Sequence, residues 1–313
     1  MKIRENTQRP AEIVLIANEK GGVGKTTTTL CLANCLTALG YSVMIADMDP
    51  SANLSVAALP DTPNLSLYDV FDGRCTLPEV LVETPFGYIA PSVKVTPGFD
   101  DDEAVVDSKS LTQIANRLIG VRGGEYMLSS LLRKSKHYDL NNYFDFILID
   151  SAPSDNILIL NAIVAADSVI VPVELSAAAV DGLQMFLGSI SNAHTYYKTN
   201  VAFDGMLTVK YAEESGSDRK MAALIDQLCQ AYNIPRYATK IRHSELMRTA
   251  LDNAKPILDY RLSTGHGPVD SMNMALEFLQ KRGLKPRADF PGVQTDENGN
   301  YYYKRPGKAE KEG

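Results

Sequence analysis

One glycine-rich stretch, ANEKGGVGKTTTT at residues 17–29, constrains this chain more than any other feature. It follows IVLIAN (13–18), a β-branched apolar run that is typical of a buried strand. It leads into TTTTLCLANCLTALG, which is typical of a helix that ends at Gly40. A strand, a glycine loop and a helix in this order predict a phosphate-binding loop, because the loop's N–H groups and the positive end of the helix face the same anion.

The loop residues have distinct expected roles. Lys25 is expected to contact the β- and γ-phosphates of a nucleotide, and Thr26 to give its hydroxyl to Mg²⁺. The expected nucleotide-binding residues are Gly21, Gly22, Val23, Gly24, Lys25, Thr26 and Thr27. The common pattern G-x-x-x-x-G-K-[ST] would place its first glycine where this chain has Glu19. A second lysine, Lys20, precedes the glycines, although a phosphate loop needs only one.

Further apolar runs alternate with segments of helical spacing. The strand candidates are SVMIAD (42–47), YIAP (88–91), DFILID (145–150), DSVIVPV (167–173) and GMLTVK (205–210). This alternation predicts an α/β fold, with a doubly wound, mostly parallel sheet flanked by helices. We expect one phosphate-loop domain over residues 1–283. Residues 284–313 are expected to be a polar tail outside the core, either disordered or folded as a small hairpin at an Asn-Gly turn.

Two acidic sites come at the ends of predicted strands. ILIDSAPS (147–154) places Asp150 where a carboxylate can organise Mg²⁺ through water. ADMDP (46–50) presents Asp47 and Asp49 two residues apart, so an extended backbone turns both to one side. One could orient an attacking water and the other support the metal shell. A solvated turn before Pro50 and a helix cap at Asp150 are the alternatives.

Composition limits other functions. The net charge of −7 argues against a general polyanion binder, yet residues 236–287 lean basic and could bind phosphates locally. The four cysteines are too few and too scattered for a disulfide framework, and we expect buried thiols at Cys31, Cys35, Cys75 and Cys229. The histidines show no metal-ligand spacing. No apolar run reaches the roughly 18 residues of a membrane span, and the polar N-terminus lacks a secretory signal, so a cytoplasmic protein is expected.

The motifs together resemble those of a known family. KGGVGKTT, DMDPSAN and FILIDSAPS are similar to the deviant Walker A, A′ and B motifs of the ParA/Soj/MinD group of P-loop ATPases. VPVELSAAAVDGL and TKIRHSELMRTALDNAKPILDY resemble two further family segments, so the resemblance covers about residues 11–283. The chain departs from the family at Ser51, at 151–153 and at Glu174. The resemblance implies ATP as the nucleotide, Mg²⁺ as the cofactor and an ATP-bound sandwich homodimer.

The resemblance also implies residue roles. Lys20 corresponds to a signature lysine that reaches the partner's nucleotide across the dimer. A cation supplied in this way stabilises charge that develops on the transferred phosphoryl group. The expected catalytic residues are therefore Lys20, Lys25 and Asp49. The expected Mg²⁺ site consists of Thr26, Asp47 and Asp150, with the aspartates acting through water.

Within the family, the sequence favours a DNA-partition ATPase that is associated with the nucleoid. In that reading ATP-bound dimers bind nonspecific DNA, and a ParB-like partner triggers hydrolysis. The expected DNA contacts are Arg242, Arg248, Lys255 and Arg261, although each could be an ordinary solvated charge. The helix-turn-helix extension of some plasmid ParA proteins is absent, so specific operator binding is not expected. The sequence does not distinguish a chromosome, plasmid or mobile-element cargo.

Three other classes of protein share some of these sequence features. A MinD-like membrane-positioning ATPase would use 272–285 as an amphipathic anchor, but family position makes this segment a core helix, and no stable membrane anchor is expected. A bacterial tyrosine kinase is suggested by Tyr301, Tyr302 and Tyr303, although DMDPSAN fits ParA better. A nitrogenase-type reductase is disfavoured because no cysteine pair sits where a bridging cluster would need it.

Overall fold

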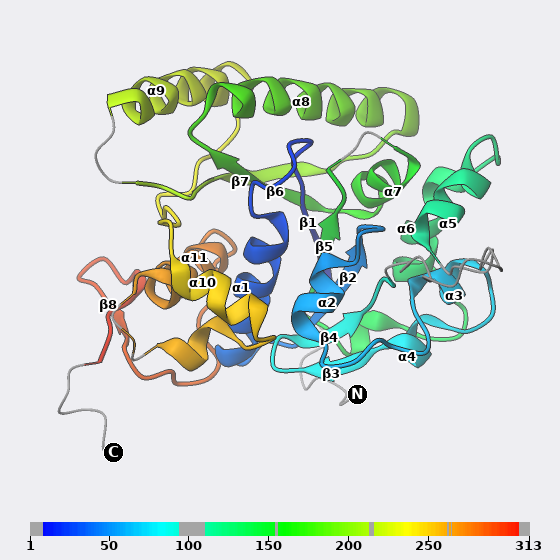
Figure 1. Cartoon of the computed structure of the whole chain (residues 1–313), viewed down its shortest axis with the longest axis horizontal. Helices are drawn as coiled ribbons and strands as arrows, with labels where there is room; N and C mark the ends of the chain where they lie inside the picture. The colour runs from blue at the N-terminus through cyan, green and yellow to red at the C-terminus, as the bar shows by residue number, and fades with distance from the viewer. Residues whose placement is uncertain are drawn as a thin grey trace, which may run out of the picture.

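A seven-stranded sheet forms the centre of the molecule (Figure 1). The computed structural model describes residues 9–93, 110–153, 156–212, 216–261, 263 and 265–306. The strand order is β3-β4-β2-β5-β1-β6-β7. The strands are β1 (Glu12–Ile16), β2 (Val43–Met48), β3 (Val82–Thr84), β4 (Gly87–Ala90), β5 (Phe146–Ser151), β6 (Ser168–Glu174) and β7 (Ala202–Val209).

Every neighbouring pair in this sheet is parallel except β3 and β4. The predicted doubly wound, mostly parallel α/β fold is therefore confirmed, and all six predicted strands are present. The antiparallel strand β3 was not predicted. It is three residues long and none of its residues is buried, so it lacks the apolar run that marks the others.

Helices cover both faces of the sheet (Figure 1). The α-helices are α1 (Lys25–Ala38), α2 (Asn53–Ala58), α3 (Leu67–Phe71), α4 (Leu77–Val80), α5 (Leu111–Leu118), α6 (Met127–Arg133), α7 (Ile157–Ala165), α8 (Ala177–Tyr197), α9 (Gly216–Ala231), α10 (Glu245–Asp252) and α11 (Gly267–Gln280). Three short 3-10 helices are η1 (Gly124–Tyr126), η2 (Leu140–Asn142) and η3 (Ile257–Tyr260). The segment 96–142 supplies α5, η1, α6 and η2 from residue 111 on, and residues 96–109 lie outside the described residues.

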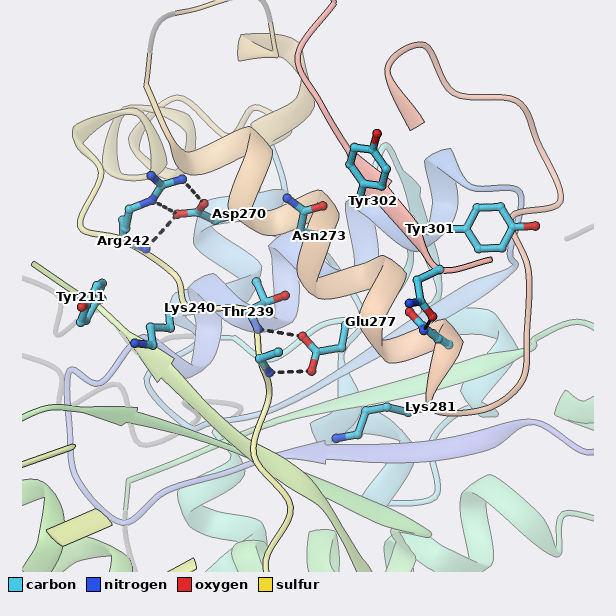
Figure 2. A pocket seen from close by; sticks show the side chains of 13 residues that line it. Tyr211, Thr239, Lys240, Arg242, Asp270, Asn273, Glu277, Lys281, Tyr301 and Tyr302 are labelled. Carbon is cyan, nitrogen blue, oxygen red and sulfur yellow. Dashed lines mark hydrogen bonds and ion pairs between the residues drawn. The ribbon is translucent and has the colours of Figure 1, made fainter. Parts of the chain in front are cut away.

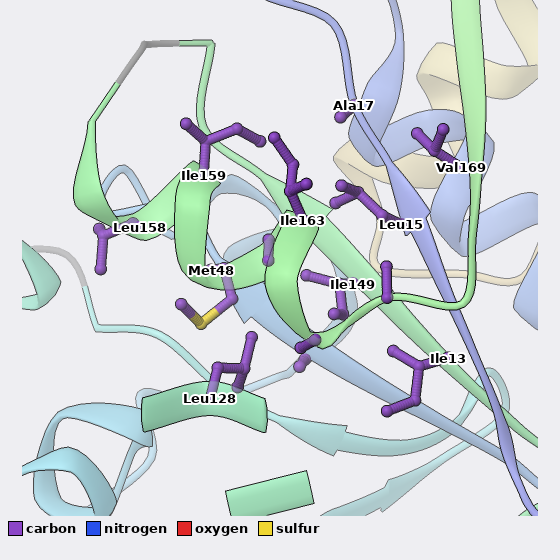
Figure 3. Packing of buried hydrophobic residues seen from close by; sticks show 14 of the residues in the cluster. Ile13, Leu15, Ala17, Met48, Leu128, Ile149, Leu158, Ile159, Ile163 and Val169 are labelled. Atoms are coloured by element: carbon purple, nitrogen blue, oxygen red, sulfur yellow. The ribbon is translucent and has the colours of Figure 1, made fainter. Parts of the chain in front are cut away.

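The sheet separates two hydrophobic cores. Ile13 and Leu15 of β1 belong to the same core as residues of α5 to α9 on one face. Figure 3 shows this core where it includes Leu128 of α6 and Ile163 of α7. The alternate residues Val14 and Ile16 pack with α1, α10 and α11 on the other face. All four β1 residues are at most 1% exposed. A strand that is buried on both faces reads as a continuous apolar run, which explains why β1 was recognisable in the sequence.

The buried thiols expected from the sequence are found at three positions. Cys31, Cys35 and Cys229 are buried, whereas Cys75 is half-buried, and all four are free. Burial raises the pKa of Cys31 to about 11, so this thiol stays protonated at neutral pH. No helix among the described residues is long and apolar enough to span a membrane.

The C-terminal segment differs from the prediction. Strands β8 (Val293–Thr295) and β9 (Tyr301–Tyr303) form the antiparallel hairpin that the Asn-Gly turn suggested. However, the expectation that this segment lies outside the core is wrong, because Tyr303 is only 3% exposed and belongs to the core around α1 and α11. Asn273 of α11 accepts a hydrogen bond from the Tyr303 backbone N–H at 2.7 Å. The segment is polar on average, but a few aromatic side chains within it pack against the core and hold it there.

Candidate nucleotide-binding site

The predicted phosphate loop connects β1 to α1 at the carboxyl edge of the sheet. Gly22 (φ +71°) and Gly24 (φ +81°) both adopt the left-handed backbone conformation that favours glycine. Gly24 is the N-cap residue of α1, and the helix begins at Lys25. The loop therefore delivers the unsatisfied N–H groups of a helix N-terminus to the end of a central strand, which is where an anion binds.

Lys25 is a buried cation inside this loop. Lys25 is the first residue of α1, and it is only 6% exposed. Its Nζ donates a hydrogen bond to the carbonyl oxygen of Lys20 at 3.1 Å. Burial lowers the pKa of Lys25, while the nearby charges of Asp150 and Asp49 oppose that shift. A phosphate group would give this desolvated ammonium a stronger partner than a carbonyl.

Asp150 lies directly beside Thr26. The Thr26 hydroxyl donates to one carboxylate oxygen of Asp150 at 2.7 Å, and the Thr29 hydroxyl donates to the other at 3.2 Å. Burial, and next the charge of Asp47, raise the pKa of Asp150 to about 8. Of the predicted metal-site residues, Thr26 and Asp150 are thus in direct contact, and the helix-cap alternative for Asp150 does not describe its contacts.

Asp47 faces Asp150 across the β2–β5 register. Its carboxylate accepts hydrogen bonds from the Ser55 N–H at 3.0 Å, the Ser55 hydroxyl at 2.6 Å and the Asp49 N–H at 3.2 Å. Burial raises the pKa of Asp47 to about 6, and the Ser55 hydrogen bonds oppose the shift. Asp47 therefore also fastens α2 to β2. Sequence reasoning missed Ser55, whose only signal is its position eight residues downstream in DMDPSANLS.

Asp49 begins the turn that leads from β2 to α2. One of its carboxylate oxygens accepts the Ser51 N–H at 2.8 Å, and Ala52 follows with a left-handed backbone. The residue is only 8% exposed. The turn before Pro50 is therefore present but is not the solvated turn of the alternative interpretation. Asp49 also contributes to the charge felt by Lys25, which places it at the same site.

Lys20 points away from the buried cluster. Its Nζ donates to the Ser176 hydroxyl at 2.9 Å and pairs with a Glu174 carboxylate oxygen at 3.4 Å. Both side chains of the ion pair are partly exposed, so the pair contributes little stability. Glu174 is one of the positions where the chain departs from the family. It lies 154 residues from Lys20 in the sequence, so no local pattern predicts their contact. Lys20 is thus held at the surface beside the loop, where it can be released at small cost.

The oxygen atoms of the site fit Mg²⁺. Among the described residues, no group of three or more His, Cys, Asp or Glu side chains could hold a metal ion alone. Mg²⁺ commonly takes one or two carboxylates together with water and substrate phosphates. The Thr26 hydroxyl and the Asp150 carboxylate are hard donors, and a cation would offset the two crowded, buried carboxylates of Asp47 and Asp150.

A cavity of about 320 Å³ adjoins the phosphate loop. It lies between the start of α1, the end of β7 and α10. Its lining residues include Gly24, Thr27, Thr28, Lys210, His243 and Met247. A larger hollow of about 910 Å³ lies elsewhere, between residues 238–242, α11 and β9 (Figure 2). Its carboxylates are already engaged by donors from residues 238–242, and it contains no residue of the phosphate loop.

The four predicted DNA contacts are not equivalent. Arg242 makes a bidentate ion pair with the buried Asp270, through hydrogen bonds of 3.0 and 2.6 Å (Figure 2). The Arg248 side chain is 75% exposed and pairs with Glu245 at 3.0 Å. Lys255 is exposed, whereas Arg261 is half-buried and contacts the Leu258 carbonyl. Arg248 and Lys255 are therefore more accessible than Arg242 for contact with a phosphate backbone. All four DNA contacts remain predictions.

The fold and the loop define a P-loop nucleotide-binding protein, and comparison with known proteins identifies its family. A family model described as an AAA domain matches residues 11–203, more than half of the 313 residues. The chromosome partitioning protein ParA of Caulobacter vibrioides is 31% identical over 279 residues, which cover 87% of this chain and 95% of that protein. The chain belongs to the ParA/MinD-type family of P-loop ATPases.

Other relatives and solved structures agree with this family. The sporulation initiation inhibitor protein Soj of Bacillus subtilis is 26% identical, covering 80% of this chain and 91% of Soj. A cobyrinic acid a,c-diamide synthase of Mycobacterium smegmatis with bound ADP and magnesium is 29% identical, with a TM-score of 0.62 over 81% of this chain and 96% of that one. A Cyanothece McdA–ATP complex has a TM-score of 0.71 over 89% of this chain and 99% of that one, and at 20% identity it supports the fold alone.

Proposed function

We propose that this protein is a Mg²⁺-dependent ATPase of DNA partition that acts on the nucleoid as a nucleotide-controlled dimer. The observation that carries the proposal is the buried arrangement of Lys25, Thr26 and Asp150, with Lys20 held separately at the surface. ATP-bound homodimers would bind nonspecific DNA, and a ParB-like partner would stimulate hydrolysis and release. The similarity to the Caulobacter partition protein over 87% of this chain supports this choice among ATPase functions.

Different residues of the site would bind the phosphates, Mg²⁺, the attacking water and the nucleoside. The N–H groups of residues 21–27 and the Lys25 ammonium would hold the β- and γ-phosphates. The Thr26 hydroxyl and, through water, Asp150 and Asp47 would hold Mg²⁺, which supplies charge neutralisation on the phosphates when bound. Asp49 would orient the attacking water. The nucleoside would occupy the cavity of about 320 Å³ beside Gly24 and Thr27.

Lys20 would make hydrolysis depend on the dimer. Within one subunit it pairs with Glu174 and Ser176, on the side of the loop away from Asp150. Leaving a weak, partly exposed ion pair costs little, so the γ-phosphate of a facing subunit could compete for the ammonium. A cation delivered in this way stabilises charge in the transition state, and an isolated subunit would lack it.

The MinD-like alternative receives less support from the structure. Its candidate anchor, residues 272–285, begins in α11, where Met272, Leu276 and Leu279 are at most 1% exposed. These side chains belong to the core around α1, so binding a lipid surface through them would require α11 to leave the sheet. Vesicle binding that depends on ATP and on residues 272–285 would favour the alternative.

ATP turnover tests the proposed site. Wild-type protein should hydrolyse Mg²⁺-ATP slowly and more rapidly when DNA and the partner are present. Lys25→Ala should lose nucleotide binding, and Asp49→Ala should bind ATP while losing turnover. Lys136→Ala, a change at an exposed lysine outside the site, is the control and should match wild type. Turnover by Lys25→Ala at the wild-type rate would contradict the assignment.

DNA association tests the predicted interface. The double variant Arg248→Ala/Lys255→Ala should weaken binding to DNA of unrelated sequences by a similar factor and flatten its salt dependence, because each phosphate contact adds to the salt slope. Lys134→Ala/Lys136→Ala removes two exposed lysines elsewhere and is the matched control. Equal loss in both double variants would assign the effect to net charge and not to this surface.

A further inference from the structure

Lys210 contacts the phosphate loop, although it lies 188 residues further along the chain than Gly22. It follows β7 directly, is exposed, and adopts a left-handed backbone with φ +51°. Its Nζ donates a hydrogen bond to the carbonyl oxygen of Gly22 at 2.7 Å, across 188 residues of sequence. Lys210 lines the cavity of about 320 Å³ proposed for the nucleoside, but no role assigned above uses its contact with the loop, and the sequence patterns did not single it out.

This contact fixes the orientation of one peptide group in the loop. The described chain contains no cis peptide bond, so the Val23 N–H points opposite to the Gly22 carbonyl. When Lys210 holds that carbonyl on one face of the loop, the Val23 N–H is turned to the other face. Gly22 has no Cβ that would restrict the rotation of this peptide group, and glycine loses more conformational entropy on ordering than any other residue. The hydrogen bond therefore restrains a peptide group whose rotation the glycine itself does not restrict.

The base of Lys210 is itself fixed. The Tyr211 N–H donates to the Ile241 carbonyl at 3.0 Å, and the His243 N–H donates to the Tyr211 carbonyl at 3.2 Å. These bonds join the end of β7 to the segment that precedes α10. Lys210 also lines the cavity of about 320 Å³ next to Gly24 and Thr27. The lysine thus extends from a rigid strand end along this cavity to the loop.

We infer that Lys210 is a positioning residue that holds the phosphate loop in its nucleotide-binding conformation through the Gly22 carbonyl. The inference rests on the proposed function, since the loop must bind a nucleotide. Lys210 acts on the shape of the loop and not on the γ-phosphate, so it sets the affinity for ATP and ADP alike. This separates it from Lys20, whose assigned role concerns hydrolysis in the dimer.

The test measures nucleotide affinity in three full-length variants. Lys210→Met removes the donor and keeps the length of the side chain, and Lys210→Arg restores a donor. Lys198→Met is the matched control, because Lys198 is also exposed and left-handed (φ +52°) but ends α8. Dissociation constants for Mg²⁺-ADP and Mg²⁺-ATP are measured by titration, together with kcat, KM and the melting temperature.

We expect Lys210→Met to weaken both nucleotides by about tenfold, the factor that corresponds to about 1.4 kcal/mol. Its kcat at saturating ATP should stay within about twofold of wild type, its melting temperature should match that of Lys198→Met, and Lys210→Arg should recover most of the affinity. Unchanged affinity in Lys210→Met, loss confined to ATP, or failure of Lys210→Arg to recover would overturn the inference.

The outcomes also separate this inference from the proposed function. If Lys25→Ala loses nucleotide binding while Lys210→Met retains it, the site stands and the role of Lys210 is rejected. If wild-type protein binds neither nucleotide, the proposed function and the role of Lys210 both fail.

Discussion

Buried charge at the level of single residues is concentrated around the phosphate loop. Asp47 and Asp150 are both fully buried and face one another across two strands. The charge of Asp150 acts on the buried Lys25 ammonium. Such carboxylates are costly in the absence of a compensating ligand. The site is therefore built for a ligand that brings both a metal ion and negative phosphates.

The stability of the nucleotide-free protein should depend on pH through Asp150. Its pKa of about 8 lies above the ordinary value of 3.8, so the folded protein binds this proton more tightly than the unfolded chain. The resulting stabilisation is complete below the unfolded pKa and is lost as the pH rises through about 8. The melting temperature should therefore fall as the pH rises from about 4 to about 8, and the melting temperature of Asp150→Asn should fall less over the same range. Equal slopes in the two proteins would contradict the assigned environment.

Lys20 should affect catalysis without affecting binding. Lys20→Gln is expected to bind ATP with the wild-type affinity, since the ammonium faces Glu174 and not the loop interior. Its partner-stimulated hydrolysis should fall by at least about tenfold, in line with the effect of losing a cation supplied in trans. Titration and turnover measured on the same preparation separate the two effects. An unchanged stimulated rate would remove the role assigned to this lysine.

The sequence predicted those site residues whose positions are set by local motifs. Lys25 and Thr26 follow from the loop pattern, and Asp150 follows from the end of an apolar strand. Ser55, Glu174 and Lys210 were not predicted as contacts, because their polar partners are reached only through the tertiary fold. A lysine after a strand has no local signal that identifies a carbonyl 188 residues away as its partner.

Among the structural elements, the C-terminal hairpin shows where composition misleads. Its Asn-Gly turn was recognisable, and Gly299 has the positive φ that such a turn requires. The packing of the hairpin against the core was not recognisable in the sequence, because Pro, Gly and charged residues dominate the segment. Phe290 and Val293 pack against the same core as Tyr303, and the Tyr41 hydroxyl donates to the Lys285 carbonyl at 2.7 Å. The hairpin is thus an extension of the core around α1 and α11.

Substitutions in β9 should show which of its tyrosines is structural. Tyr303→Ala should lower the free energy of unfolding by about 3 kcal/mol, because a buried ring is lost from the core. Tyr302→Ala, at a residue that is 39% exposed, should change it by no more than about 0.5 kcal/mol. The Tyr303 hydroxyl is buried and has no hydrogen-bond partner among the described residues, so Tyr303→Phe should be neutral or stabilising. Denaturant unfolding measures all three, and equal effects of the two alanine changes would contradict the docking.

For the molecule as a whole, the sheet places all the nucleotide-binding elements at one edge. The ends of β1, β2 and β5 supply the loop, Asp47, Asp49 and Asp150, and the end of β7 supplies Lys210. The same β7 end is hydrogen-bonded to residues 241–243, which lead into α10 and its exposed Arg248. A short chain of hydrogen bonds thus joins the phosphate loop to the segment before α10, whose Arg248 belongs to the predicted DNA surface.

Sedimentation of Asp49→Ala with nonspecific DNA tests this account most directly, because the variant should retain ATP without turnover. With Mg²⁺-ATP it should sediment as a dimer of the 34.2-kDa chain and move with the DNA, and added salt should weaken the complex. With Mg²⁺-ADP it should sediment as a monomer apart from the DNA. Absence of DNA binding at low salt with ATP, or equal binding with ATP and ADP, would contradict the account.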